Sequence, residues 1–342
     1  MKKLAVILSL ICVFLFSGCS CGGKTALQFD SKWGENKIGY TEILTYGVSY
    51  AHDYSFGGYD FSKNNTLPDL SVSVDGEYVV KNEIVSLTGD GVPDTIKNSP
   101  LTTGMPYIVK STTALNLTAT YDYNGTQSSS IDAIYTESYF CPSESSLSPI
   151  SSFEKYDYSL LYVTDKVTLT KTVGENTLTY NQDNYVVNQK VFSAETGEKT
   201  TEINKTYDYE VKTVIDNSSL LLGVRNLNFS TINEYIIPTV HATYGEAQDL
   251  SVTYFENSDI TLDVSVNGEQ KQDLTVATRA VKYLISSSDK SGANQLVFVQ
   301  NGGNELPDKS LIIRYVSPFS DYSAYRKAGA LIYDLKSVDF YS

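Results

Sequence analysis

Histidine, methionine and tryptophan are scarce in this chain, and their scarcity limits the chemistry open to it. Its 342 residues include two histidines, two methionines and one tryptophan. His52 and His241 stand far apart in the sequence, and neither belongs to an H-E-x-x-H pattern or another metal-ligand spacing. We therefore predict neither a bound metal ion nor a cofactor.

Basic residues are also few. Lysine and arginine total 26 against 40 aspartates and glutamates, which gives a formal net charge of −14 at pH 7. Binding to nucleic acid requires clustered lysine and arginine that neutralise phosphates, and no such cluster occurs. The same acidity disfavours electrostatic adhesion to anionic lipid headgroups. Nucleic acid is therefore excluded as a partner, and solubility is the simplest role of the charge.

The apolar run at the N-terminal end is too short for a permanent membrane span. Lys2 and Lys3 precede apolar residues 4–16, and Ser17-Gly18-Cys19 follows. A spanning helix needs roughly 18 apolar residues or more. A basic start, an apolar middle and small residues at a cleavage site are the parts of a secretory signal, so we predict that residues 1–18 are a signal peptide.

The end of this signal carries a more specific pattern. Phe16-Ser17-Gly18-Cys19 resembles the lipobox of bacterial lipoproteins, although Phe16 stands where leucine is usual. The resemblance implies that Cys19 is diacylated on sulfur, becomes the first residue and anchors the chain outside the cytoplasmic membrane, in the cell envelope. The alternative is an ordinary secretory signal that leaves Cys19 as a plain thiol.

The same junction also matches a nucleotide-binding pattern. Residues 18–25 satisfy G-x-x-x-x-G-K-[ST], but that loop needs a strand before it and a helix after it. An export signal precedes the pattern here, so we interpret the match as an accident of the processing site.

Only four cysteines are present. Cys12 leaves with the signal and Cys19 is the lipidation candidate, so Cys21 and Cys141 remain. The two either form a disulfide or stay as thiols. A secreted chain of this length does not need one bridge to fold.

The dominant pattern along the rest of the chain is alternation of apolar and polar residues between turn signals, which predicts an all-β protein rich in antiparallel hairpins. Asp-Gly and Asn-Gly pairs favour two-residue turns because both residues tolerate positive φ. The predicted two-residue turns are Asp75-Gly76, Asn124-Gly125 and Asn267-Gly268. Residues 173–176 and 195–198 are predicted to form longer hairpin loops.

Composition divides this β protein into segments. Residues 19–40 lack periodicity and are predicted to be a lipid-proximal tether, whereas residues 141–152 are rich in serine and proline, as linkers are. We therefore predict two β-sandwich-like domains, at 41–140 and 153–342. The alternative for the second is a curved half-barrel that encloses an acyl chain.

One segment has an aromatic face. The large residues between positions 46 and 56 fall on even positions and include Tyr46, Tyr50, Tyr54 and Phe56. On one continuous strand these side chains share a face. Exposed, the face would bind sugar rings or a peptide; buried, it would form part of a core. Tyr46, Tyr50, Tyr54 and Phe56 are our candidate ligand-binding residues.

Two other motifs carry weaker signals. Residues 88–94 resemble the end of a calcium-binding thrombospondin-type-3-like repeat, but only Asp90 and Asp94 supply carboxylates, so a turn is expected. The Gly47-Val48-Ser49 segment lacks the second glycine of a nucleophile elbow. We predict no catalytic residue and no enzyme activity.

The sequence thus predicts a lipid-anchored bacterial surface protein that is a non-catalytic binding or structural module. Its expected partners are the membrane, through the acyl anchor, and a glycan or protein of the envelope or the extracellular space. The alternatives are a lipid-carrying envelope lipoprotein and an unrecognised cell-wall hydrolase.

Overall fold

A computed structural model was obtained for the chain. It describes residues 37–61, 69–142, 147–209, 215–225, 227–229, 232–241, 245, 247–285, 295–302, 306–321 and 326–342. The predicted lipidation residue Cys19 and its neighbour Cys21 lie outside these ranges, so the signal, the anchor and the tether stay predictions.

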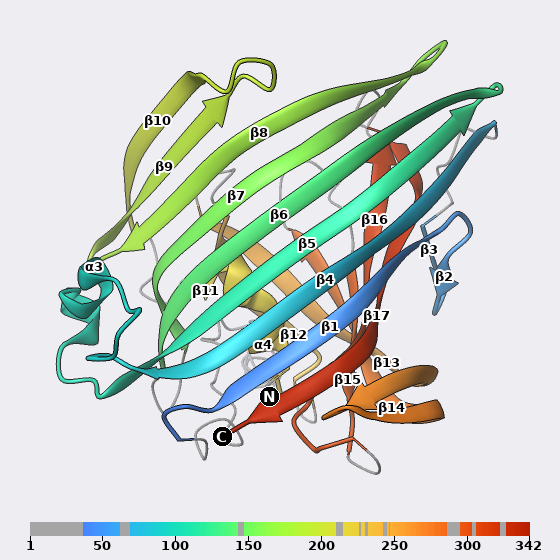
Figure 1. Cartoon of the computed structure of the whole chain (residues 1–342). Coiled ribbons are helices and arrows are strands. Elements are labelled where there is room, and N and C mark those ends of the chain that lie inside the picture. Colours follow the sequence, from blue (N-terminus) through green and yellow to red (C-terminus); the bar gives the residue numbers. More distant parts are fainter. Residues whose placement is uncertain are drawn as a thin grey trace, which may run out of the picture.

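The chain is an all-β protein, as predicted, and most of its strands belong to one sheet of 15 strands (Figure 1). The N-terminal half of this sheet consists of β1 (Thr41–Ala51), β4 (Leu70–Ser86), β5 (Tyr107–Tyr123), β6 (Thr126–Pro142), β7 (Leu147–Val163), β8 (Val167–Tyr180), β9 (Asn184–Phe192) and β10 (Lys199–Asp208). The C-terminal half consists of β11 (Ile215–Asp216), β12 (Glu234–Val240), β13 (Ala247–Val266), β14 (Glu269–Ile285), β15 (Gln295–Gln300), β16 (Ile312–Asp321) and β17 (Arg326–Tyr341). The strands β2 (Ser55–Phe56) and β3 (Tyr59–Asp60) pair separately.

The N-terminal half is an antiparallel meander in which β4 to β10 follow one another in the order of the sequence. The turn between β5 and β6 is the predicted Asn124-Gly125 pair, with φ of 53° and 76°. Gly197 has a φ of 72° in the predicted loop between β9 and β10. These two hairpins are therefore confirmed, and their residues supply the positive φ that such turns require.

Two of the predicted turns are wrong, because their glycines lie inside long strands. Gly76 pairs with Leu117 in the middle of β4, and Gly174 pairs with Tyr156 in the middle of β8. A Cβ on Gly76 would lie 2.6 Å from the Asn116 carbonyl oxygen, and one on Gly174 would lie 2.2 Å from the Tyr156 hydroxyl. Close approach of neighbouring atoms, and not a turn, explains glycine at both positions.

The C-terminal half returns to the start of the chain. β17 pairs with β16 on one side and with β1 on the other, and it also meets β13 at Ser337 and Val338. Asn267-Gly268 forms the predicted turn between β13 and β14, with φ of 49° and 83°. The N-terminal and C-terminal halves are therefore parts of one continuous sheet.

This continuity corrects the predicted division into two sandwich-like domains. Residues 141–142 end β6 and residues 147–152 begin β7, so most of the predicted linker is paired strand. Proline is compatible with position 149 because the pairing of β6 and β7 shifts register there, between Pro149 and Ser151, and strand interiors accept proline at such bulges. A Ser-rich composition does not distinguish such a strand from a linker.

The main hydrophobic core takes residues from both halves of the sheet. Leu44 and Leu117 from the N-terminal half pack in the same cluster as Leu262 and Val297 from the C-terminal half. Two short helical turns, η2 (Asn217–Ser219) and α4 (Leu220–Val224), lie inside the curved sheet, where Val224 joins this core (Figure 1). The inward face of the sheet is the face that carries Leu44 and Leu117.

The outward face is covered locally by the connection between β4 and β5. This connection contains α3 (Asp94–Lys97) and η1 (Pro100–Thr102), and Ile96 of α3 packs with Ile108 and Cys141. The Cys141 thiol is buried, and its Sγ donates to the Leu101 carbonyl at 3.2 Å. Burial raises the pKa of Cys141 to about 11, so it stays protonated at neutral pH. Its pairing with Cys21 stays a prediction.

Among the described residues, no helix combines the length and the apolar character needed to cross a bilayer. Residues 87–93 form the expected turn, and Asp94 begins α3. Asp90 and Asp94 are both exposed to solvent.

Candidate functional site

The four predicted aromatic binding residues do not form one exposed face. β1 ends at Ala51, so Tyr54 and Phe56 follow it in the β2–β3 hairpin and its approach. Tyr46 is 3% exposed and belongs to the core. Tyr50, Tyr54 and Phe56 are partly buried and pack against that core. The interpretation of this segment as one exposed binding face is therefore corrected. After Ala51 the chain leaves β1, and the aromatic side chains pack against the core.

Ring contacts show how this closure works. The Phe56 ring lies 4.8 Å from Phe298 and 5.9 Å from Phe255, between ring centroids. Tyr50 meets Phe319 edge to face at 5.7 Å. These are packing distances between aromatic side chains. The residues join β1 and the β2–β3 hairpin to strands of the C-terminal half.

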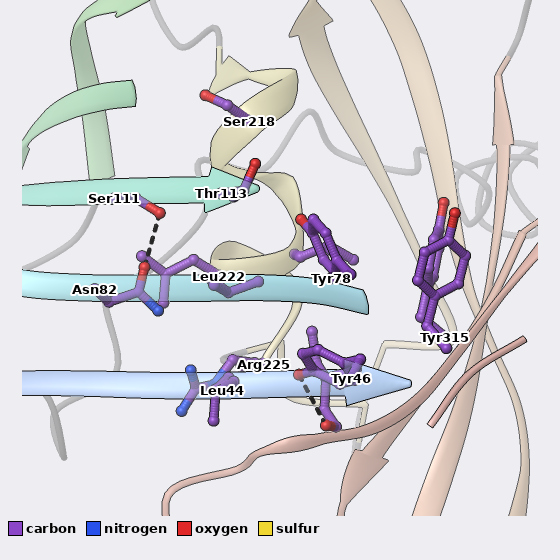
Figure 2. Close-up of a pocket in the computed structure, with 14 residues that line it drawn as sticks. Leu44, Tyr46, Tyr78, Asn82, Ser111, Thr113, Ser218, Leu222, Arg225 and Tyr315 are labelled. Atoms are coloured by element: carbon purple, nitrogen blue, oxygen red, sulfur yellow. Dashed lines mark hydrogen bonds between the residues drawn. The ribbon is translucent and has the colours of Figure 1, made fainter. Parts of the chain in front are cut away.

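Tyr46 does line a pocket, on the inward face of the sheet beside α4 (Figure 2). Its hydroxyl donates to the Ile312 carbonyl at 3.0 Å. The cavity volume is about 30 Å³, which is room for a water molecule or two. The other lining residues are Leu44, Tyr78, Val80, Asn82, Ser111, Thr113, Ser218, Leu221, Leu222, Arg225, Ile312, Tyr315 and Tyr333.

A row of polar side chains crosses the inward face beside this pocket. Strand pairing places Glu42 of β1 opposite Asn82 of β4, and Asn82 opposite Ser111 of β5. Ser111 is opposite Ser138 of β6, which is opposite Ser152 of β7. All five residues are buried. We call Glu42, Asn82, Ser111, Ser138 and Ser152 the inner polar row.

Arg225, directly after α4, binds one end of the inner polar row. Its Nη1 and Nη2 donate to the two carboxylate oxygens of Glu42 at 2.6 and 3.0 Å. Its Nε donates to the Ser310 carbonyl at 3.0 Å, and Nη2 also donates to the Lys309 carbonyl at 2.8 Å. The arginine is 2% exposed and the glutamate 0%. One side chain thus joins β1, α4 and the segment that precedes β16.

Hydrogen bonds continue along the row. Asn82 donates through Nδ2 to Glu42 at 3.1 Å, and the Ser111 hydroxyl donates to Asn82 Oδ1 at 2.8 Å. Figure 2 shows Ser111 and Asn82 on neighbouring strands, with Arg225 beside Leu44. A buried ion pair is costly unless its remaining polar atoms are bonded, and these contacts meet that condition.

Asp216 binds the other end of the row. Its Oδ2 accepts hydrogen bonds from Ser152 of β7 and Tyr180 of β8, both at 2.7 Å. Its Oδ1 accepts from the backbone N–H and the hydroxyl of Ser218, at 2.9 and 2.5 Å. Ser138 donates to the Ser218 hydroxyl at 2.7 Å. Asp216 thus caps η2 and fastens the edge strand β11 to β7 and β8.

The surroundings fix the protonation of nearby groups. Burial alone would lower the pKa of Arg225, but the adjacent Glu42 carboxylate raises it above the ordinary value. Burial raises the pKa of Tyr78 and of Tyr333 to about 12. Burial also raises the pKa of Tyr180, and the charge of Asp216 adds to that rise. These phenols stay protonated at neutral pH, and the Tyr180 hydroxyl donates to Asp216.

The inner polar row, with Arg225 and Asp216, holds several elements of the fold together. The Ser111 and Ser152 hydroxyls donate to Asn82 and Asp216. His52, after the end of β1, is partly exposed beside Asp53, whereas the charges of Glu154 and Asp216 act on His241. In the part of the chain that the structure describes, no three His, Cys, Asp or Glu residues are grouped to hold a metal ion.

The inner polar row was missed in the sequence, although a weak signal for it exists. Glu42 has the same alternation phase as Leu44, Tyr46 and Val48, which are all buried. A charged residue in a buried phase indicates a buried partner. The partner, Arg225, is 183 positions away and no spacing rule connects the two residues.

No protein-family model matches the chain, and no curated protein matches it. Among solved structures, it is similar to the crystal structure of a β-barrel-like protein of domain of unknown function DUF1849 from Brucella abortus. The match has a TM-score of 0.50 and 8% sequence identity, and it covers 90% of this chain and 100% of that chain. At this identity the likeness shows the fold alone, which is all-β and barrel-like.

Proposed function

We propose that the chain is a lipid-anchored bacterial surface protein whose folded part is a non-catalytic binding or structural module for a glycan or protein of the envelope. The leader supports the anchor, because Lys2 and Lys3, the apolar residues 4–16 and Cys19 occur in the order that lipoprotein processing requires. The hydrogen-bonded interior of the folded part supports its role as a binding or structural module.

One observation carries the proposed role of the folded part. The buried charges of the interior, Glu42, Arg225 and Asp216, are each held by several hydrogen bonds from the chain itself. A site that recognises a ligand keeps polar groups available for it. The interior therefore serves the fold, and recognition is assigned to the outer surface.

The lipid-carrier alternative requires a larger pocket than the one beside α4. Ordinary small-molecule sites enclose roughly 300–1,000 Å³, and an acyl chain needs a comparable space. The pocket beside α4 has about 30 Å³. The inward face is occupied by side chains of the chain's own core, including Leu44 and Leu262. We therefore favour the binding or structural module.

The anchor is tested by expressing the full chain and its Cys19→Ser variant in a bacterial host. We expect the wild-type chain in the membrane fraction, with a mature N-terminal peptide that begins at Cys19 and carries acyl mass. The serine variant should leave that fraction or keep its leader. Cys21→Ser, two residues away, is the matched control and should behave as wild type. An unmodified Cys19 in the mature protein would contradict the anchor.

A further inference from the structure

The two edges of the sheet differ in a way that points to an interaction surface. One edge strand, β11, has two residues and is fastened through Asp216. The other edge strand, β10, has 10 residues and pairs with β9 alone among the strands that the structure describes. Figure 1 shows β10 at the margin of the fold. A long edge strand presents backbone donors and acceptors to another strand.

β10 adds little to the core. Side chains 199–206 are all exposed, and Ile203 is 48% exposed. Most strands bury one face, and that burial offsets the conformational entropy lost when the strand is ordered. β10 is held by its pairing with β9 and by Tyr207, whose ring stacks on Tyr185 at 5.4 Å, so residues 199–206 contribute little burial of their own and their free edge is open to a further strand.

The usual protections against strand addition are weak here. Residues 199–208 contain no proline and no glycine. A register shift occurs only at the start, between Lys199 and Thr201. The Lys199 ammonium is bonded to Glu202, and the Lys205 Nζ lies 4.4 Å from the centre of the Tyr207 ring. Both lysines thus bind along their own strand, whereas a protecting lysine projects from the edge.

The outward face shows which side chains an added strand needs. Pairing places Lys155 of β7 opposite Glu175 of β8, and Glu175 opposite Lys190 of β9. Lys190 is opposite Glu202 of β10. Charges therefore alternate across four neighbouring strands and end in an acid at the edge. Opposite charges in facing positions stabilise strand pairs, so the next position favours lysine or arginine.

The inward face adds a second requirement. Glu154 of β7, Asn176 of β8, Gln189 of β9 and Ile203 of β10 are opposite one another in register. This row ends in an exposed apolar side chain, so an apolar residue on an added strand would bury it. Because the two faces alternate along a strand, the required basic and apolar residues are adjacent in the partner.

A second copy of the chain does not meet these requirements. Two antiparallel β10 strands related by a two-fold axis keep their outward faces on the same side. The outward residues of β10 are then opposite other outward residues, which are Lys199, Glu202, Asn204, Thr206 and Asp208. Lys199, the only basic residue among them, is already bonded to Glu202 of its own strand, so a second copy offers no further cation to Glu202 or Asp208.

We infer that β10 is a docking edge for an extended segment of another protein, which adds an antiparallel strand with a basic residue beside Glu202 and an adjacent apolar residue beside Ile203. This inference rests on the proposed role as a binding module and narrows its ligand to a protein strand. Asp208 lies six positions beyond Glu202 on the same face and favours a second basic residue. Main-chain hydrogen bonds supply affinity, and the facing side chains supply specificity.

The test uses the full-length chain in detergent and two fluorescent peptides with blocked ends. One has the order lysine, four threonines, valine, lysine, which places its lysines opposite Asp208 and Glu202 and its valine opposite Ile203. The other has glutamate in place of both lysines. Fluorescence anisotropy measures binding. We expect saturable binding of the lysine peptide, at least about tenfold tighter than that of the glutamate peptide.

Charge reversal on the chain sharpens the test. The double variant Glu202→Lys with Asp208→Lys should invert the preference, so that the glutamate peptide binds more tightly than the lysine peptide. The variant Glu195→Lys with Glu198→Lys makes the same charge change in the adjacent turn and should keep the wild-type preference. Circular dichroism checks that each variant is folded.

Three results would overturn the inference. They are no saturable binding, equal binding of both peptides to the wild-type chain, and a dimer in sedimentation that Ile203→Lys dissociates. The last result would assign the edge to a second copy of the chain. If Cys19 is acylated but the chain binds neither peptide, the docking edge is overturned and the anchor is not. The two proposals can therefore fail separately.

Discussion

The two halves of the sheet are built differently. In the N-terminal half, β4 and β5 pair over residues 70–86 and 107–123 without a register shift. In the C-terminal half, β13 and β14 pair with shifts between Tyr254 and Glu256 and between Leu262 and Val264. β15 is buried at five of its six positions, so both of its faces are covered. Consecutive antiparallel strands build both halves, but the second half adds a parallel contact between strands distant in sequence, β13 and β17.

The largest expected effect comes from cutting the contact that joins the halves. Arg225→Met leaves the Glu42 carboxylate buried without its cation, which should lower the free energy of unfolding by about 3–5 kcal/mol. Urea denaturation measures the loss. Lys81→Met, which removes the exposed Lys81–Glu83 pair, is the matched control and should cost about 0–1 kcal/mol. Equal losses in the two variants would contradict a structural role for the buried pair.

Asp216→Ala tests the closure at the β11 edge. The substitution leaves the buried hydroxyls of Ser152 and Tyr180 without their acceptor, at a cost of about 2 kcal/mol. Hydrogen exchange should increase in β7 and β8 before it increases in β13 and β14. Asp165→Ala, on an exposed turn, should leave the free energy of unfolding close to that of the wild-type chain. Unchanged exchange in β7 would show that Asp216 does not hold this edge.

Gly174→Ala tests whether close packing, and not a turn, requires glycine at position 174. The added methyl group meets the Tyr156 hydroxyl and the Lys190 carbonyl, which should cost about 2 kcal/mol in thermal or urea unfolding. Tyr156→Ala should reduce that penalty in the double variant. Gly125→Ala meets no atom within 4 Å but strains a residue with a φ of 76°, for about 1 kcal/mol. A Gly174 penalty that Tyr156→Ala leaves unchanged would contradict the packing explanation.

The smallest effect is a pH dependence from His241. Burial holds its pKa below the ordinary value of 6.5, although Glu154 and Asp216 act in the opposite direction. As the pH falls through 6.5, the unfolded chain binds a proton before the folded chain does, so stability decreases by up to about 1.4 kcal/mol per pH unit.

Urea unfolding at about pH 7.5 and about pH 5.5 measures this loss. His241→Gln should reduce the difference between the two conditions. A wild-type chain that is more stable at the lower pH would contradict the sign.

The sequence predicts the N-terminal half better than the way the two halves join. Alternation and the Asn124-Gly125 pair identify β5, β6 and their turn, because these signals are local. The same reasoning misplaced turns at Gly76 and Gly174, since glycine serves both tight turns and close packing. Nothing local connects Glu42 with Arg225, or β1 with β17, so one sheet was interpreted as two domains.

Hydrogen exchange on the intact wild-type chain tests the central claim, that the two halves form one cooperative structure joined at β1, β17 and Arg225. Under mild denaturant, the amides of β4 to β8 and those of β13 to β17 should lose protection in the same step and at the same denaturant concentration. Complete exchange in β4 to β8 while β13 to β17 stay protected would contradict the claim and restore two separate domains.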